Sequence, residues 1–132
     1  MNYFKIDGRC WFVDLPGYGY AAVAKAERDR WARLMESFFA EPEQISHGVH
    51  IVDARHKPTA DDVTMSGWFK DSGRPFVVVA NKVDKLSKTA AAQNMALIRE
   101  TLELDEETPL IAFSAEKGDG RPELLGRILS EL

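Results

Sequence analysis

Four short apolar segments recur along the 132-residue chain, and each is separated from the next by a longer stretch with helical spacing. They cover residues 10–13, 49–52, 76–80 and 110–113. This alternation predicts βα units and a mostly parallel sheet. The segment 76–80 is apolar at every position, which is typical of a strand that helices cover on both faces. We therefore expect an α/β fold with this strand deep in its core.

Four stretches have the spacing of amphipathic helices. One spans about residues 25–40, and the others carry their apolar stripes at 63–69, 91–102 and 125–132. The string Thr59-Ala60-Asp61-Asp62 resembles a capping box at the start of the second helix, and Pro122 suits the first turn of the last one. The dipeptide at positions 7 and 8, Asp-Gly, predicts that the chain opens with an antiparallel hairpin of residues 3–6 and 9–13.

The composition, with 45% hydrophobic and 29% charged residues, is that of one soluble globular domain. No apolar run approaches the roughly 18 residues of a membrane span, and the N-terminus does not resemble a signal peptide, so we expect a cytoplasmic location and no membrane partner. The single cysteine, Cys10, excludes an internal disulfide and disfavours a zinc site. A net charge of -4 argues against bulk binding to a phosphate backbone.

In open α/β sheets, ligands bind outside the carboxyl ends of the strands. Each of the four apolar segments ends in polar residues, and we expect the four ends to meet at one edge of the sheet. The residues concerned are Asp14-Leu15-Pro16-Gly17, Asp53, Asn81-Lys82-Val83-Asp84 and Ser114-Ala115-Glu116-Lys117.

Residues 81–84 match the pattern N-K-x-D directly after a buried strand. The carboxylate of Asp84 can accept two hydrogen bonds from the N1 and N2 amines of guanine, and adenine offers no such pair of donors. Asn81 can tie neighbouring loops together, while the stem of Lys82 covers the base. In isolation a plain polar turn explains these residues equally well, so the other motifs of the chain decide between the two interpretations.

Residues 14–17 match D-x-x-G, in which the Asp reaches Mg²⁺ through a water and the Gly N–H meets a γ-phosphate. In isolation a Pro-Gly turn that closes a strand is the simpler interpretation. Residues 113–115, Phe-Ser-Ala, would supply a backbone N–H to the guanine O6. The three motifs end successive apolar strands in the order used by GTP-binding domains, which favours GTP or GDP over coincidence. The residues expected at the nucleotide are Asp14, Leu15, Pro16, Gly17, Asn81, Lys82, Val83, Asp84, Phe113, Ser114 and Ala115.

Two longer strings make the resemblance specific: DLPGYGYA at residues 14–21, and IVDARHKP at 51–58 with Asp62 and Met65 beyond. From about Arg9 to the C-terminus the chain resembles the EngB (YihA) family of bacterial GTPases, which are linked to assembly of the large ribosomal subunit. The resemblance implies a three-layer P-loop GTPase (Ras-like) domain, GTP hydrolysis with Mg²⁺, a large-subunit precursor as partner, and a link to cell division and septation.

Family members carry a G-x-x-x-x-G-K-[ST] loop and a switch threonine upstream of the D-x-x-G strand, and the 132 residues contain neither. We therefore expect residues 1–132 to be a partial GTPase domain, from the switch II region to the C-terminal helix, that lacks the first strand and first helix. It would be a fragment of the gene product or a natural short form.

Without that loop the chain alone is expected to bind GTP weakly or not at all, to hold no Mg²⁺ and to be inactive as an enzyme. Asp14 would meet the ion, through water, only in a domain that has the loop. Tyr18 stands where many GTPases place a water-orienting Gln, so no catalytic residue is assigned.

Two alternatives stay open: a nucleotide-free module that contacts protein or RNA through the helix after the switch and the Arg55 region, and a decayed GTPase. Loss of a central strand would leave apolar edges. Residues 9–13 would then pair with 49–52, exchange with a second copy as a homodimer, or be disordered up to about residue 24, and we favour the homodimer.

The remaining candidates for chemistry are weaker. We expect no metal site at His47, His50 and His56. The basic residues at 55–57, Arg-His-Lys, are either a contact for ribosomal RNA or a solvated loop. The three tryptophans are expected to fill the core. They are Trp11, Trp31 and Trp68.

Overall fold

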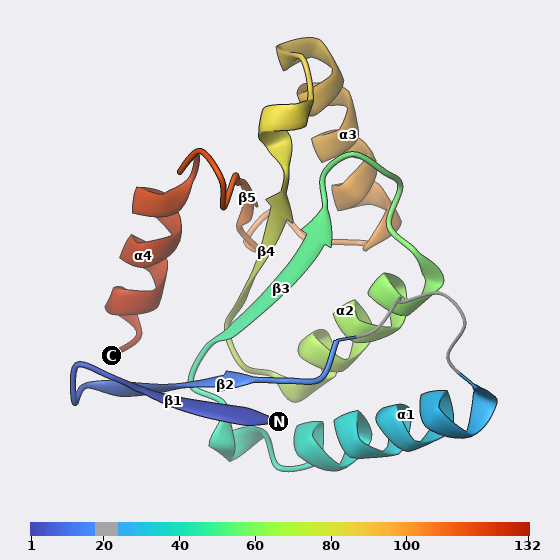
Figure 1. The fold of residues 1–132 in the computed structure, drawn as a ribbon, viewed down its shortest axis with the longest axis vertical. Helices are drawn as coiled ribbons and strands as arrows, with labels where there is room; N and C mark the ends of the chain where they lie inside the picture. Colours follow the sequence, from blue (N-terminus) through green and yellow to red (C-terminus); the bar gives the residue numbers. More distant parts are fainter. Residues whose placement is uncertain (18–23) are drawn as a thin grey trace.

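The computed structural model describes residues 1–17 and 24–132 and combines a parallel sheet, a separate hairpin and flanking helices (Figure 1). Tyr18 and the rest of the string 18–21 lie outside the described residues. The strands are β1 (Asn2–Ile6), β2 (Cys10–Asp14), β3 (Gly48–Asp53), β4 (Phe76–Asn81) and β5 (Leu110–Ala112). The helices are α1 (Lys25–Phe39), α2 (Ala60–Ser72), α3 (Lys88–Thr101) and α4 (Arg121–Ser130), with short 3-10 turns at Pro42–Gln44 and Val83–Lys85.

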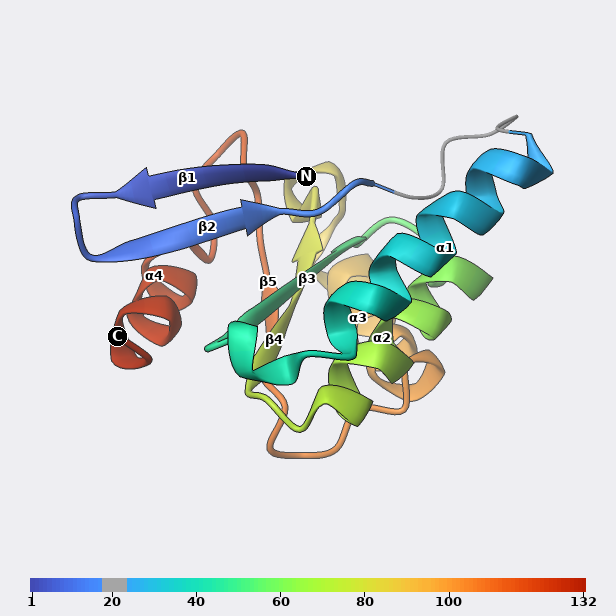
Figure 2. The ribbon, with the colours of Figure 1, turned by 90° about the horizontal axis from the view of Figure 1, so that it is seen from below.

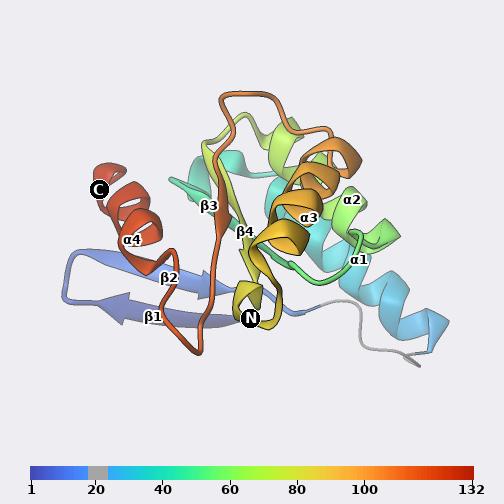
Figure 3. The same ribbon diagram turned by 90° about the horizontal axis from the view of Figure 1, so that it is seen from above.

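The parallel sheet has the order β3-β4-β5, so β4 has a hydrogen-bonded neighbour on each side. Helices α1, α2 and α3 lie on one side of this sheet and α4 on the other, as Figures 2 and 3 show. Residues 77–80 of β4 are at most 1% exposed. The predicted three-layer α/β fold and the buried position of this strand are both confirmed.

Two apolar clusters hold the helices to the sheet. One joins α3 to the sheet through buried residues such as Val52, Val78 and Ile98. The other joins α1 to α2 and includes Met35 and Phe69. Phe69 also stacks on the ring of His50, a buried residue of β3. Burial lowers the pKa of this histidine to about 4, because the charged form loses its hydration.

The start of α2 confirms the predicted capping box. The Thr59 hydroxyl accepts the Asp62 N–H at 3.1 Å, and the Asp62 carboxylate accepts the Thr59 N–H at 2.9 Å. Both donors belong to the first turn of a helix, where no backbone acceptor is available. Pro122 lies in the first turn of α4, as expected. Within residues 1–17 and 24–132, no helix has the length and apolar character needed to cross a bilayer.

The predicted hairpin is confirmed: β1 pairs with β2 in antiparallel register, and Asp7 and Gly8 at its turn have φ of 51° and 67°. Positive φ at both positions matches the twist of the flanking strands. The prediction that all three tryptophans fill the core is wrong for Trp11, which lies on the separate hairpin and is 60% exposed. Trp31 and Trp68 are partly buried and pack against the α1–α2 cluster, as predicted.

The expectation that the strand ends meet at one edge is confirmed for β3, β4 and β5, whereas β2, which ends at Asp14, belongs to a sheet of its own. Nor does β2 pair directly with β3, one of the three outcomes foreseen. In complete domains of the family that the sequence resembles, a further strand lies between these two. Among the described residues no strand bridges β2 and β3, and β2 pairs with β1 alone.

Candidate functional site

Residues 81–84, which we call the NKVD loop, begin at the carboxyl end of β4 and turn sharply. Lys82 has φ of 72° and ψ of 27°, a left-handed conformation that is uncommon for residues other than glycine. The Val83 N–H then donates to the Phe113 carbonyl at 3.0 Å. This bond holds the loop against residues 113–115, which follow β5 and which we call the SA loop.

Two side chains of the NKVD loop bind the SA loop. The Asn81 Oδ1 accepts the Ala115 N–H at 3.1 Å, as expected for a residue that ties neighbouring loops together. The Ser114 hydroxyl donates to Asp84 Oδ1 at 2.9 Å, and Ser114 is fully buried. The Lys117 N–H in turn donates to the Ser114 hydroxyl oxygen at 2.9 Å. This bond fixes the direction in which the hydroxyl donates to Asp84. The structure therefore brings together all the base-side residues that the sequence singled out.

The Asp84 carboxylate is held ionised and oriented. The hydrogen bond from Ser114, helped by the charge of Lys85, keeps the pKa of Asp84 below its usual value. The Lys85 ammonium lies 3.6 Å from Asp84 Oδ2 and 3.4 Å from the Glu116 carboxylate. An ionised carboxylate accepts two parallel N–H donors, so this geometry suits a planar ring with adjacent donors. Sequence analysis did not predict that Ser114 orients Asp84. The one feature of the sequence that could have indicated this role is the hydroxyl residue at the end of the strand.

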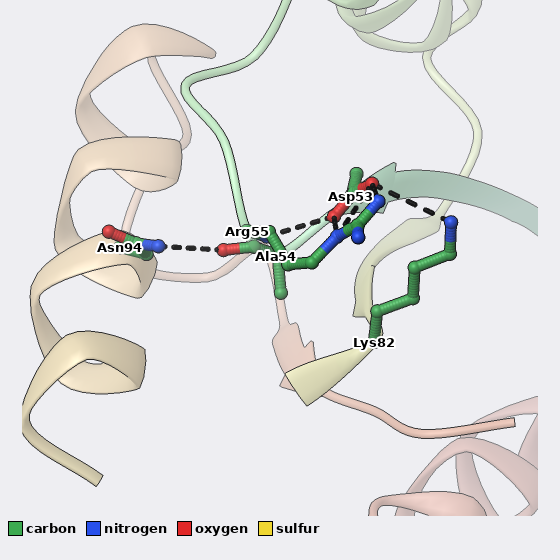
Figure 4. A network of polar contacts seen from close by, with 5 residues as sticks. All are labelled: Asp53, Ala54, Arg55, Lys82 and Asn94. Atoms are coloured by element: carbon green, nitrogen blue, oxygen red, sulfur yellow. Dashed lines mark hydrogen bonds and ion pairs between the residues drawn. The ribbon is translucent and has the colours of Figure 1, made fainter. Parts of the chain in front are cut away.

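On the other side of the NKVD loop, Asp53 ends β3 in register with Asn81 (Figure 4). Its carboxylate accepts the Arg55 backbone N–H at 2.9 Å and the guanidinium Nη2 at 2.8 Å. The Lys82 ammonium lies 3.7 Å from Asp53 Oδ2. These donors and cations, the Arg55 side chain foremost, lower the pKa of Asp53 to about 2. Sequence analysis placed Asp53 at the edge but missed this network, whose signals were the cations at 55 and 82.

The backbone beside Asp53 is fixed from two directions. The Ala54 N–H donates to the Asn81 carbonyl at 2.7 Å, which extends the pairing of β3 with β4. The Ala54 carbonyl accepts a hydrogen bond of 2.9 Å from the Asn94 amide of α3 (Figure 4). Beyond this point residues 55–57 are exposed. In the part of the chain that the structure describes, no group of three His, Cys, Asp or Glu side chains could hold a metal ion.

The residues expected at the phosphates are placed differently. Asp14 is exposed at the end of β2, and Leu15 packs against the α1–α2 cluster. The Pro16 carbonyl accepts a hydrogen bond of 2.8 Å from the Trp31 indole, and Gly17 is exposed. The contacts described for the D-x-x-G segment are therefore with α1 and the α1–α2 cluster.

Comparison with known proteins identifies relatives over nearly the whole chain. The family described as 50S ribosome-binding GTPase matches residues 1–82. A "Probable GTP-binding protein EngB" of Clostridium beijerinckii is 43% identical over 131 residues, which cover 99% of this chain and 66% of that protein. A protein of the same description from Shouchella clausii is 39% identical over 132 residues, which cover 100% of this chain and 67% of the relative.

Solved structures with the same fold include the crystal structure of a probable GTP-binding protein engB, with a TM-score of 0.86 at 20% identity. That match covers 98% of this chain and 80% of the other. The apo crystal structure of translation elongation factor SelB from Methanococcus maripaludis matches with a TM-score of 0.73 at 21% identity. That match covers 97% of this chain and 26% of the factor. These two matches show the fold.

The chain spans about two thirds of the length of the curated relatives that it matches. The fold is that of P-loop GTPases, and the family description matches more than half of the chain. Together with identities of about 40% over nearly every residue, this shows that the chain belongs to the EngB family of GTP-binding proteins.

Proposed function

We propose that this chain carries the guanine-recognising part of a GTP-binding site, within a GTPase that acts in assembly of the large ribosomal subunit. One observation carries the proposal: a buried serine, Ser114, fixes the ionised Asp84 carboxylate at the edge of the parallel sheet. Asn81 binds the adjacent Ala115 N–H, so that the two loops form one rim.

The proposed contacts follow from this rim. Asp84 accepts the N1 and N2 donors of guanine, and the Ala115 N–H turns to the O6 atom of the base. That N–H is engaged by Asn81 in the structure, so the Asn81 oxygen shares or releases it when the base binds. The Lys82 methylenes then cover one face of the ring. Val83 and Phe113 contribute through the backbone bond that joins the loops.

The phosphate side is proposed to use residues 14–17 in a complete GTP site. GTPases of this kind use Mg²⁺, which binds through one or two carboxylates together with phosphate oxygens and waters. Asp14 supplies a single exposed carboxylate, and the described residues hold no metal-ligating cluster, so they do not fit the ion by themselves. We derive no hydrolytic step from them.

The chain alone is therefore proposed to bind GTP poorly and not to hydrolyse it. Residues that cradle the phosphates of a P-loop protein contribute charge-assisted hydrogen bonds of roughly 1.5–3 kcal/mol each. Losing about four of them costs on the order of 6 kcal/mol, or about four decades in affinity. Calorimetric titration with GTP tests this proposal, and a submicromolar dissociation constant would contradict it.

The proposed partner is a precursor of the large ribosomal subunit in the cytoplasm. Its support is the family description, 50S ribosome-binding GTPase, together with the exposed basic residues at 55–57. A homodimer is also proposed, because β3 is an edge strand and Ile51 on it is 60% exposed. Light scattering tests the dimer, and a monodisperse monomer at high concentration would contradict it.

The base-recognition proposal is tested by Asp84→Asn in the 132-residue chain. An amide offers a donor that suits the O2 of xanthine and removes the acceptor pair for guanine. We expect the preference to move from GMP towards XMP in an NMR titration, because the monophosphates probe the base without the missing phosphate contacts. Asp71→Asn, an exposed carboxylate of α2, is the matched control. Unchanged preference would show that Asp84 is a loop residue and would favour the nucleotide-free interaction module.

A further inference from the structure

The NKVD loop is held at both neighbouring strand ends, that of β5 and that of β3. Asn81 and Asp84 bind the SA loop on the β5 side. Lys82, between them in sequence, points to the β3 side, where its ammonium lies 3.7 Å from Asp53 (Figure 4). The left-handed backbone at Lys82 separates these directions, since it turns the chain between Asn81 and Val83.

Asp53 is a rigid partner for Lys82. Its strand is paired with β4 up to Asn81, and the next carbonyl is fixed by Asn94. The Arg55 backbone N–H also holds the carboxylate at 2.9 Å. The Lys82 side chain is 51% exposed, whereas that of Asp53 is 32% exposed, so the mobile partner is the lysine and the fixed one is the aspartate.

We propose that Asp53 is a positioning residue for guanine recognition, which holds the Lys82 ammonium at the end of β3 and thereby lays the Lys82 stem beside the base rim. This inference rests on the proposed function and extends it to a residue outside the NKVD and SA loops. Asp53 does not touch the base. It acts through Lys82, and it restrains the strained turn in which Lys82 lies.

The Arg55 side chain shares the same carboxylate and supplies the control. Its Nη2 lies 2.8 Å from Asp53 Oδ2, and this pair is exposed. If Asp53 acts by ordering the 55–57 loop, removing the guanidinium will reproduce the loss of Asp53. If Asp53 acts through Lys82, Arg55→Gln will leave base binding unchanged, because the Arg55 backbone N–H still fixes the carboxylate.

A double-mutant cycle in the full 132-residue chain tests the proposal with two NMR measurements. Asp53→Asn keeps the shape and removes the charge, and Lys82→Met keeps the stem and removes the ammonium. The first measurement is GMP affinity. The second, without nucleotide, is amide exchange of Lys85, whose N–H donates to the Lys82 carbonyl at 3.1 Å. Each single variant is expected to weaken GMP binding and to speed Lys85 exchange about threefold, as for a partly exposed ion pair.

The double variant is expected to lose no more than either single variant, because both remove the same contact. Three results would each overturn the proposal. The losses of GMP affinity in the two single variants could multiply in the double variant, or Asp53→Asn could bind GMP with wild-type affinity. Arg55→Gln could also lose as much GMP affinity as Asp53→Asn. If the unmodified chain shows no saturable response to GMP even at high nucleotide concentration, the proposal of guanine recognition fails. The exchange cycle then still decides whether Asp53 anchors Lys82, so the two failures are distinguishable.

Discussion

Residues 10–13 of the hairpin and residues 76–80 of the parallel sheet are both apolar runs, yet the two sheets bury them very differently. Residues 77–80 of β4 are at most 1% exposed, whereas Tyr3 and Trp11 of the hairpin are 59% and 60% exposed. β4 has a strand on each side and helices over both faces of its sheet, whereas β2 is paired only with β1 among the described strands. Burial in this chain therefore follows the number of neighbouring layers rather than the composition of the strand.

The same difference governs the polar residues at the strand ends. At the end of β4, Asn81 and Asp84 are fixed by the neighbouring SA loop, and Lys82 faces Asp53 at the end of β3. At the end of β2, Asp14 is exposed on the hairpin. A site built on the central strand is thus positioned before any ligand binds, which lowers the cost of recognition. The D-x-x-G segment has no comparable frame on the parallel sheet.

The largest expected effect comes from opening a cavity in the parallel-sheet half. Ile98 of α3 is fully buried against the sheet, so Ile98→Ala should lower the free energy of unfolding by about 3 kcal/mol. Trp11→Ala removes a larger side chain that is exposed, and we expect a loss of about 0.5 kcal/mol or less. Urea denaturation followed by circular dichroism measures both. Equal losses would show that the hairpin and the sheet unfold as one tightly coupled unit.

A second contrast is in the response to acid. The unfolded His50 binds a proton below its ordinary pKa of 6.5, and the folded one does so only near its lowered pKa of about 4. The unfolded state thus holds more protons between these values, and stability should fall by about 3 kcal/mol as the pH drops from 6.5 to 4. His47, whose pKa burial also lowers, adds in the same direction.

His50→Leu should flatten this part of the stability curve, which urea titrations at several pH values measure. Asp53 provides a separate window. Its pKa is lowered to about 2, so the stability it contributes is present above its ordinary pKa of 3.8 and is lost as the pH falls below that value. A slope between pH 6.5 and 4 that is undiminished in the His50 variant would contradict the assignment of this effect to the buried imidazole of His50.

The smallest effect is local to the hairpin. Gly8 has φ of +67°, a conformation that costs other residues roughly 1–2 kcal/mol. Gly8→Ala should therefore speed amide exchange in β1 and β2 by about tenfold, since each 1.4 kcal/mol is a factor of ten. The midpoint of global unfolding should stay unchanged, because the strain lies in a sheet separate from β3-β4-β5 and no described atom lies within 4 Å of the added methyl group. A shift in that midpoint would mean that the hairpin supports the sheet.

Much of the fold could be predicted because the signals were local. The uniformly apolar run of β4 and the Thr59–Asp62 capping box each reflect interactions within a few residues. The sheet to which β2 belongs could not be predicted, because it depends on the partner strand available to β2. The burial of Trp11 could not be predicted for the same reason, since this residue lies on the separate hairpin, where it is 60% exposed.

At the candidate site, the N-K-x-D and S-A motifs predicted which loops come together, because parallel strands bring their carboxyl ends to one edge. The direction of each side chain could not be predicted. That Ser114 orients Asp84 and that Lys82 turns towards Asp53 depends on the left-handed turn at Lys82, which the sequence does not mark with a glycine.

The most direct test of the central claim is a residue-resolved NMR map of GMP binding to the 132-residue chain. If the edge of the parallel sheet recognises guanine, saturable shift changes will concentrate in the NKVD and SA loops, with Ala115 foremost, and AMP will cause none of them. The amides of β1 and β2 will stay unchanged. Equal changes with AMP, changes confined to the hairpin, or no saturable change at all would contradict the claim.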